Sequence, residues 1–358
     1  MKRIAFICGP QLGHVGRLHK IAERLKKKFP TELTLIVPRD DKFARTVFGE
    51  DCNIIVVPAT EEAVFSKAEI FADALAQVFQ STRFDLIVQD IGVFDWLPLV
   101  KFPDCPRAVV TNVFLSKVTN SETLQVRNMS ERGDELNRMR EERNLPRLES
   151  VFDLYEADRV FLADPLPIIR EFGELPSHYV ACGATSWTME GSLPPELEDK
   201  RDLLLMSMGS TGRHGFNPRQ IERVRVRSGC SHSVYVGSRF EKMRDKGVAQ
   251  FQYEWLPLEE VLSRTKIALS QGGAGSSYQA LSKGVPVIAL PLHRNQEVLG
   301  ETLENLGVGI CIPKTERPGQ ILNSIDFEAL AKNAKQFAIE TAHEDGAGTI
   351  AEAIEELL

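Results

Sequence analysis

The sequence lacks paired cysteines, long hydrophobic runs and a strong excess of either charge. Its six cysteines stand singly at positions 8, 52, 105, 182, 230 and 311, with no CxxC pair and no histidine at ligand spacing. They therefore indicate neither a disulfide framework nor a structural zinc. No apolar run approaches the roughly 20 residues of a membrane span, and the opening MKRIAFICGP has too short an apolar stretch for a signal peptide. The 43 basic and 50 acidic residues give a net charge of −7, which provides no reason to expect a nucleic-acid partner. These absences predict a cytosolic protein.

Short apolar runs dominate what is present. The 358 residues, 43% of them hydrophobic, are enough for about two domains with their own cores. Such runs are typical of strands buried on both faces of a sheet, and helical periodicity between them, as in Leu18, Ile21 and Leu25, predicts a doubly wound parallel sheet. Six runs begin at residues 3, 33, 53, 84, 107 and 159, and six more begin at residues 203, 233, 251, 266, 285 and 308.

The two series of runs are separated by residues 181–200, which are rich in Gly, Ser, Thr and Pro and typical of an interdomain connection. We predict an α/β protein with two Rossmann-like domains, at residues 1–183 and 201–340. Residues 184–200 would form the linker.

Residues 121–150 differ from the rest because they mix both charge signs densely and carry few large apolar side chains. This pattern predicts a solvated helical excursion. The alternative is a binding role, in which the segment shapes an acceptor pocket or faces the inner surface of a membrane. The arginines at positions 127, 132, 138, 140 and 143 motivate that alternative.

The turn after the first predicted strand, CGPQLGHVGR at residues 8–17, is the first candidate for chemistry. Gly9 and Gly13 permit a sharp bend, and the helix that follows would attract anions at its N-terminus. The turn is not GxGxxG, so a dinucleotide site is disfavoured. His14 would lie at the edge of the sheet where such folds bind ligands, although a lone histidine is equally compatible with a packing role.

A carboxylate at the same edge could orient His14. Asp90 ends the buried run that begins at Phe84, and a hydrogen bond from His14 to it would fix the tautomer and stabilise the imidazolium. Asp95 is the alternative partner, and its structural role would be a helix cap.

The segment SQGGAGSS at residues 270–277 follows a predicted strand and opens a helix. Gly272, Gly273 and Gly275 would allow close backbone approach, while the first-turn amides, Ser276 and Ser277 face a phosphate. A tight turn capped by serine is the simpler alternative. The regular strand, loop and helix spacing on both sides favours a phosphate-bearing ligand.

Residues 253–310 resemble the nucleotide-sugar glycosyltransferases of the GT-B fold, in both the UDP-glycosyltransferase and the MurG-like families. The resemblance also includes LGH near the N-terminus, and Gly209 and Ser210 after the first run of the second series. The segment from Ala342 is similar to the family's closing helix, which implies a helix at residues 341–358 that packs back on the first domain. The donor signature is carried, in order, by Trp255, Pro257, Gly272, Gly273, Ala280, Leu281, Gly284, Pro286 and Gln296.

The resemblance implies two domains that face each other across a cleft, the first binding an acceptor and the second a nucleotide-sugar, most often UDP-linked. His14 would deprotonate the acceptor hydroxyl, with Asp90 orienting it, in an inverting transfer that needs no metal and no cofactor. Trp255 would stack on the nucleobase, Gln279 would face the ribose, and Asn295 and Gln296 would hold the sugar. The diphosphate would be bound by Gly209, Ser210, Thr211, Gln271, Gly272, Gly273, Gly275 and Ser276.

Three positions depart from the signature. Gln271 replaces the histidine of the turn, Gln279 the ribose-binding carboxylate, and Asn295 the aspartate of the sugar-binding pair. Two other functions remain open: a UDP-sugar 2-epimerase of the same fold, and a nucleotide-sugar-binding partner subunit without activity. The acceptor hydroxyl is not specified by the sequence, and a lipid or a small glycoside would both fit.

Overall fold

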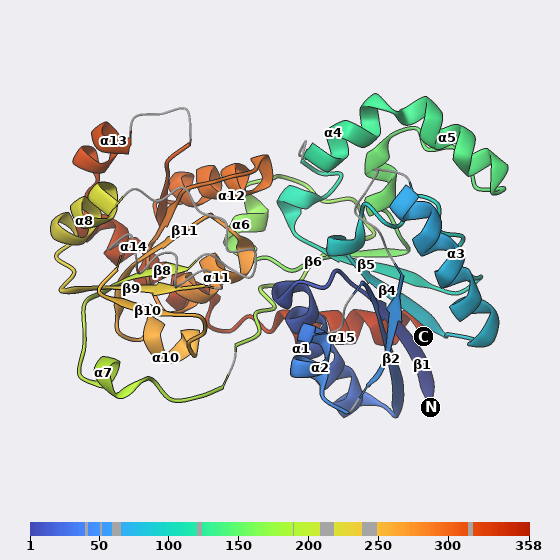
Figure 1. Ribbon diagram of the computed structural model, residues 1–358, viewed down its shortest axis with the longest axis horizontal. Helices are drawn as coiled ribbons and strands as arrows, with labels where there is room; N and C mark the ends of the chain where they lie inside the picture. The colour runs from blue at the N-terminus through green and yellow to red at the C-terminus, as the bar shows by residue number, and fades with distance from the viewer. Residues whose placement is uncertain are drawn as a thin grey trace. The chain divides into compact units, whose positions relative to one another are not determined.

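The computed structural model describes residues 1–39, 42–50, 52–58, 66–119, 124–188, 190–207, 218–237, 249–313 and 318–358. The chain divides into two compact units. Unit 1 comprises Met1–Thr185 and Asp345–Leu358, and unit 2 comprises Ser186–Glu344. Each unit is built on its own parallel sheet with helices around it (Figure 1), which confirms the predicted fold class of two Rossmann-like domains.

Unit 1 contains a seven-stranded sheet with the order β3-β2-β1-β4-β5-β6-β7, in which all neighbouring strands are parallel. Six strands coincide with predicted apolar runs. The seventh, β7, was not predicted. The strands are β1 (Lys2–Ile7), β2 (Thr31–Pro38), β3 (Asn53–Val57), β4 (Leu86–Asp90), β5 (Arg107–Thr111), β6 (Arg159–Leu162) and β7 (Tyr179–Ala181).

Helices cover both faces of this sheet, with α1, α2 and α15 on one face and α3 on the other (Figure 1). The apolar face of α1 packs Leu18, Ile21 and Leu25 into the core, as their spacing predicts. The α-helices of unit 1 are α1 (Leu12–Lys28), α2 (Lys42–Phe48), α3 (Ser66–Ser81), α4 (Leu124–Glu131), α5 (Gly133–Glu142), α6 (Leu166–Arg170) and α15 (Gly346–Leu357).

Helix α15 returns the end of the chain to unit 1, where it packs on α1. Lys28 pairs with Glu355 at 3.1 Å and Arg24 pairs with Asp345 at 2.9 Å, so charges at both ends of α15 are matched by α1. Ile350, Ala351 and Ile354 supply its buried face. Because α15 completes the core of unit 1, the unit is formed from two separate stretches of the chain.

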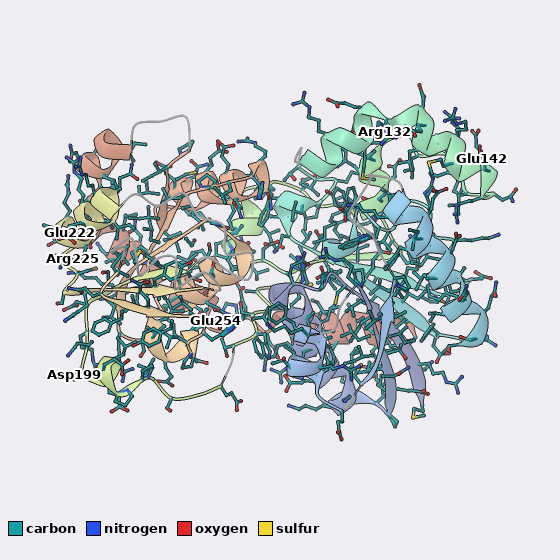
Figure 2. The ribbon with its side chains drawn as sticks, viewed as in Figure 1. Arg132, Glu142, Asp199, Glu222, Arg225 and Glu254 are labelled. Atoms are coloured by element: carbon teal, nitrogen blue, oxygen red, sulfur yellow. The ribbon has the colours of Figure 1, made fainter. Side chains whose placement is uncertain are left out.

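The segment predicted as a solvated excursion forms α4 and α5, and it is less solvated than its charge pattern suggests. Arg132 and Glu142 mark the two ends of α5 and are exposed (Figure 2). Met129 and Leu136, however, are buried in the same hydrophobic core cluster as Phe71 of α3. Arg140 is also buried and donates to the carbonyl of Pro98. A few apolar residues at the right spacing are enough to dock a helix that is otherwise polar.

Unit 2 contains a six-stranded parallel sheet with the order β10-β9-β8-β11-β12-β13. All six strands coincide with predicted runs. They are β8 (Leu203–Ser207), β9 (His232–Val236), β10 (Phe251–Tyr253), β11 (Thr265–Ser270), β12 (Val287–Ala289) and β13 (Gly309–Cys311). The helices are α7 (Pro195–Glu198), α8 (Pro218–Arg227), α10 (Leu258–Leu262), α11 (Ala274–Ser282), α12 (Arg294–Asn305), α13 (Pro318–Ser324) and α14 (Phe327–Thr341).

Candidate functional site

The strand order of unit 1 reverses between β1 and β4, which are neighbours although two strands separate them in the sequence. Open α/β sheets bind ligands at the carboxyl ends of the strands beside such a switch point, because the loops leave the sheet there in opposite directions. His14 lies in the first turn of α1, directly after β1, and Asp90 is the last residue of β4. The fold therefore brings both predicted residues to the switch point.

His14 and Asp90 are hydrogen-bonded, with Nδ1 of His14 2.6 Å from Oδ1 of Asp90. A carboxylate can only accept, so Nδ1 carries the proton and Nε2 is left as the basic nitrogen. Asp90 is fully buried, whereas 30% of the His14 side chain is exposed. The alternative partner, Asp95, instead pairs with Lys67.

Asp90 is held as a carboxylate. Burial raises its pKa, but the charge of Arg17 and the contacts with His14 outweigh burial and hold the pKa of Asp90 well below its usual range. Its Oδ1 also accepts a hydrogen bond from the backbone N–H of Gly92 at 2.6 Å. Asp90 is therefore a fixed negative charge beneath the imidazole of His14.

Gly92 is required for this geometry by close approach. A Cβ at Gly92 would lie 2.8 Å from Cγ of His14 and 3.0 Å from Oδ1 of Asp90. Any side chain would displace one of the two residues. Sequence reasoning missed Gly92, because the short distances come from packing between β4 and α1, which no local pattern encodes.

The strand order of unit 2 reverses between β8 and β11. The loop after β11 contains the predicted turn, with Gln271, Gly272 and Gly273 leading into α11. Gly272 has φ of +78°, and a Cβ there would lie 2.9 Å from the carbonyl oxygen of Gln296. Glycine is thus needed at 272 both for the left-handed backbone and for the packing of the turn against α12.

The N-terminus of α11 is partly exposed to solvent. Gly273 is its N-cap, and no acidic side chain lies in its first turn. A Cβ on Gly275 would meet nothing within 4 Å. Ser276 is partly exposed, whereas Ser277 is fully buried, so only the first can reach a ligand from solvent. The free first-turn N–H groups and the helix dipole suit an anion such as phosphate.

The amide side chains of Gln271 and Gln296 in unit 2 make some hydrogen bonds, but one amide group has no partner among the described residues. Oε1 of Gln296 accepts from the N–H of Leu292 at 2.8 Å, and its Nε2 lies 3.5 Å from Oε1 of Gln271. Gln271 is buried, yet its Nε2 donates to no acceptor within the described residues. A buried donor without an acceptor is costly, by about 1–3 kcal/mol, and a ligand beside the turn would supply one.

Gln279 makes a hydrogen bond within unit 2. Its Nε2 donates to the carbonyl of Trp187 at 2.7 Å, while its Oε1 is buried and has no donor among the described groups.

Trp255, between β10 and α10, leaves 38% of its surface exposed, and Asn295 is half-buried in the first turn of α12. Gly209, Ser210 and Thr211, predicted to bind the diphosphate, lie outside the described residues.

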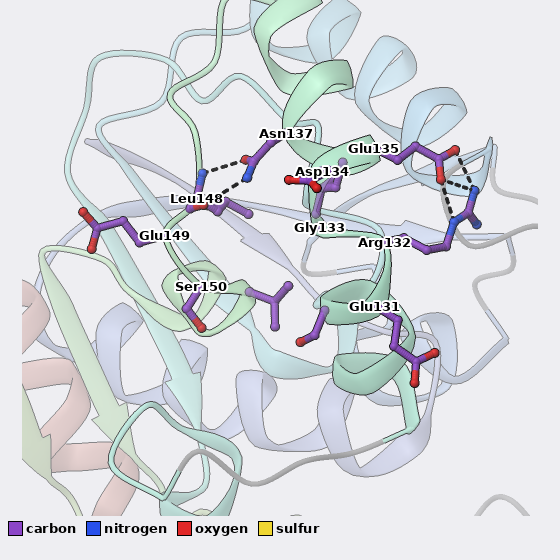
Figure 3. Close-up of a pocket in the computed structure, with 12 residues that line it drawn as sticks. Glu131, Arg132, Gly133, Asp134, Glu135, Asn137, Leu148, Glu149 and Ser150 are labelled. Atoms are coloured by element: carbon purple, nitrogen blue, oxygen red, sulfur yellow. Dashed lines mark hydrogen bonds and ion pairs between the residues drawn. The ribbon is translucent and has the colours of Figure 1, made fainter.

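A cavity of about 560 Å³ lies in unit 1 beside the junction of α4 and α5 (Figure 3). Its walls come from residues 130–137 and 148–151. Asn137 joins the two walls, since its side chain exchanges hydrogen bonds with the backbone of Leu148 at 2.8 and 3.1 Å. Glu135 is paired with Arg132 at its rim. The cavity lies in the segment for which an acceptor pocket was the alternative prediction.

The described residues contain no helix long and apolar enough to cross a bilayer. Within the same ranges, no three His, Cys, Asp or Glu side chains are grouped so as to hold a metal ion.

Two parallel-sheet α/β units, each with polar groups at the switch point of its sheet, define the class of the fold as GT-B. Residues 249–357 match the family described as "Erythromycin biosynthesis protein CIII-like, C-terminal domain". The chain is also similar to "Glycosyltransferase GtfC" of Amycolatopsis orientalis, with 27% identity over 191 residues that cover 50% of this chain and 45% of that relative. It thus matches less than half of that relative's length.

Solved structures resemble the chain over its full length. The glycotransferase of kitacinnamycin has a TM-score of 0.76 at 17% identity, covering 99% of both chains. The spinosyn rhamnosyltransferase SpnG has a TM-score of 0.73 at 15% identity, covering 99% of this chain and all of its own. SpnG has also been solved with thymidine diphosphate and with the spinosyn aglycone. The chain therefore resembles GT-B glycosyltransferases in fold throughout and in sequence over its C-terminal part.

Proposed function

We propose that this chain transfers a sugar from a nucleoside diphosphate sugar to an acceptor hydroxyl. The observation that carries the proposal is the His14 and Asp90 pair at the switch point of unit 1, which leaves Nε2 of His14 as a base. A neutral hydroxyl is a poor nucleophile until a base takes its proton. The names of the glycosyltransferase relatives support the same reaction class.

In the proposed reaction, Nε2 of His14 takes the acceptor proton as the acceptor oxygen bonds to the anomeric carbon. The bond from that carbon to the diphosphate oxygen breaks, and the nucleoside diphosphate leaves with the electron pair. Displacement from the opposite face inverts the anomeric configuration. The proton on His14 is then released to solvent.

Unit 2 would hold the donor. The first turn of α11, with Gly273, Gly275 and Ser276, would bind the diphosphate and stabilise the negative charge that develops on it without an essential metal. Gln271 would donate its unpaired Nε2 to a phosphate oxygen. Trp255 would stack on the base, Gln279 would accept from the ribose, and Asn295 with Gln296 would contact the sugar. Gly209, Ser210 and Thr211 would complete the phosphate site.

The donor we propose carries a pyrimidine nucleotide, with UDP the first choice and thymidine diphosphate, which SpnG binds, the second. The acceptor would be a hydroxylated aglycone of the general kind named for SpnG, and the cavity beside α4 and α5 is its candidate pocket. We propose a location in the cytosol, because the protein and its nucleotide-sugar donor would have to be in the same compartment.

A thermal-shift screen of UDP-, TDP- and GDP-sugars tests the donor without knowledge of the acceptor. A true donor present at 100 times its Kd should stabilise the protein by about 2.7 kcal/mol. Donors that bind are then offered with a panel of phenols, alcohols and glycosides, with and without EDTA, and products are detected by mass spectrometry. Donor binding without transfer to any acceptor would instead favour the non-catalytic partner subunit. Rearrangement of the donor alone would favour an epimerase.

A further inference from the structure

Arg17 is a buried cation beside the proposed base. It lies one helical turn after His14 on α1, so the two side chains share a face of the helix. Only 6% of Arg17 is exposed. A guanidinium is almost never buried without partners, because it keeps its charge at all physiological pH values. Its position therefore needs an explanation.

The partners of Arg17 come from the ends of two strands. Its Nε donates to Oδ2 of Asp90, the last residue of β4. Its Nη1 donates to Oδ1 of Asn112 at 3.2 Å, and its Nη2 donates to the carbonyl of Val110 at 3.3 Å, both from the end of β5. Asn112 is itself fixed, since its amide donates to Oδ1 of Asp164 at 2.7 Å. Arg17 and His14 thus bind different oxygens of the Asp90 carboxylate: Arg17 donates to Oδ2, and His14 contacts Oδ1.

Arg17 also faces His14 directly, with its Nη2 3.5 Å from Nδ1 of the ring. Because Nδ1 of His14 already donates to Asp90, it cannot accept a hydrogen bond from Arg17. The guanidinium of Arg17 would repel the imidazolium that forms when the ring gains a second proton. Among the described residues, Asp90 from β4 and Arg17 from α1 are charged side chains in contact with the ring. Cys8 follows β1 and is neutral, because burial and Asp90 raise the pKa of its thiol. Asp164 is linked to Arg17 through Asn112.

We propose that Arg17 is a positioning residue for the transfer reaction: it orients Asp90 toward Nδ1 of His14 and offsets the negative charge of Asp90 beside the imidazole ring. This inference rests on the proposed function for its link to catalysis. The electrostatic effect on His14 does not, because it acts in the free protein. A positively charged group within about 4–6 Å moves a titration by one to three pH units.

The test is an NMR titration of the protein labelled in its seven histidines, with the His14 signal assigned from the His14→Asn variant. In Arg17→Met the titration midpoint of His14 should rise by about one pH unit or more. In Arg17→Lys, which keeps the charge, it should stay within about half a unit of the wild type. A midpoint in folded Arg17→Met within about 0.3 units of the wild type would overturn the inference.

A charge-balanced variant covers the case in which Arg17→Met fails to fold. In Arg17→Met/Asp90→Asn the midpoint should stay within about half a unit of the wild type, because opposing charges are removed together. If Arg17 did not act on His14, losing Asp90 would lower the midpoint by about one unit or more.

Transfer kinetics complete the test where wild-type transfer is detected. The acidic limb of kcat/KM should move with the NMR midpoint in Arg17→Met and be restored in Arg17→Lys. If the limb does not follow the midpoint, Arg17 is not a positioning residue for the reaction. Failure of wild-type transfer would count against the proposed function and would leave the NMR result to decide the effect of Arg17 on His14.

Discussion

The polar sites of the two units are built from opposite kinds of groups. The unit 1 site (His14, Arg17, Asp90, Asn112, Asp164) is charged, and its buried carboxylates and guanidinium are paired with one another or with backbone. The unit 2 site (Gln271, Gly273, Ser276, Gln279, Gln296) consists of amides, a hydroxyl and helix-end N–H groups. Two of its buried amide atoms have no partner among the described residues.

The charged site of unit 1 and the neutral site of unit 2 suit different roles. A charged network that is complete without a ligand is organised to hold one histidine in one orientation. A neutral site with unpaired buried atoms is organised to receive a ligand that pairs them. A protein of net charge −7 can bind a diphosphate through backbone N–H groups and amide side chains, because these groups are neutral and do not repel the negative phosphates. Four predictions test the contrast.

The largest effect is expected for His14→Ala. If unit 1 supplies the base, kcat/KM for transfer should fall by about 10²- to 10⁴-fold. Nucleotide affinity, measured by calorimetry, should be unchanged because unit 2 is untouched. His19→Ala, on the same helix, is the matched control and should transfer normally. Near-wild-type transfer by His14→Ala would remove the base assignment.

The next effect is on stability. Asp90→Asn leaves Arg17 buried without its carboxylate, and breaking a buried ion pair in this way costs about 3–5 kcal/mol. Trp96 reports unit 1 alone when Trp187 and Trp255 are replaced by Phe, so its fluorescence in urea measures the loss. Asp95→Asn, whose ion pair is partly exposed, should cost much less. Equal losses in the two variants would contradict the special role of Asp90.

In unit 2, Trp255→Ala should weaken nucleotide binding by about 1–3 kcal/mol, the range found when an aromatic ring that stacks on a base is removed. Calorimetry with UDP and thymidine diphosphate measures the change. Tyr253→Phe is the control, because it alters the same segment by removing only the hydrogen bond to Glu196. Transfer kinetics at saturating donor should change little. An unchanged affinity would disprove stacking.

The smallest effect is a pH slope in the stability of unit 1. The pKa of Asp90 is lower in the folded protein than its ordinary value near 4, so the unfolded chain binds more protons in acid. The contribution of Asp90 is therefore complete above that value and is lost as pH falls below it, by about 1.4 kcal/mol per pH unit. The Trp96 reporter should show this slope, and Asp90→Asn should flatten it. The same slope in both proteins would show that Asp90 is not its source.

Local sequence patterns were sufficient for most of the fold. Twelve strands lie on predicted runs, because strands buried on both faces need continuous apolar residues. Strand β7 was not predicted, and the buried faces of α4 and α5 were hidden by surrounding charges. For the candidate sites, His14, Asp90 and the turn at Gly272 could be located because residues at strand ends converge on one sheet edge in any doubly wound fold.

The sequence alone determined where the strands and helices form, since hydrophobic period and glycine conformation act over a few neighbouring residues. It also determined that Gly272 occupies a turn that needs a left-handed residue. Only the tertiary structure decided that Arg17 and Asp90, 73 residues apart, share one buried ion pair, and that Gly92 leaves room for His14. Such contacts depend on which strands become neighbours, and no local pattern around Arg17 records that choice.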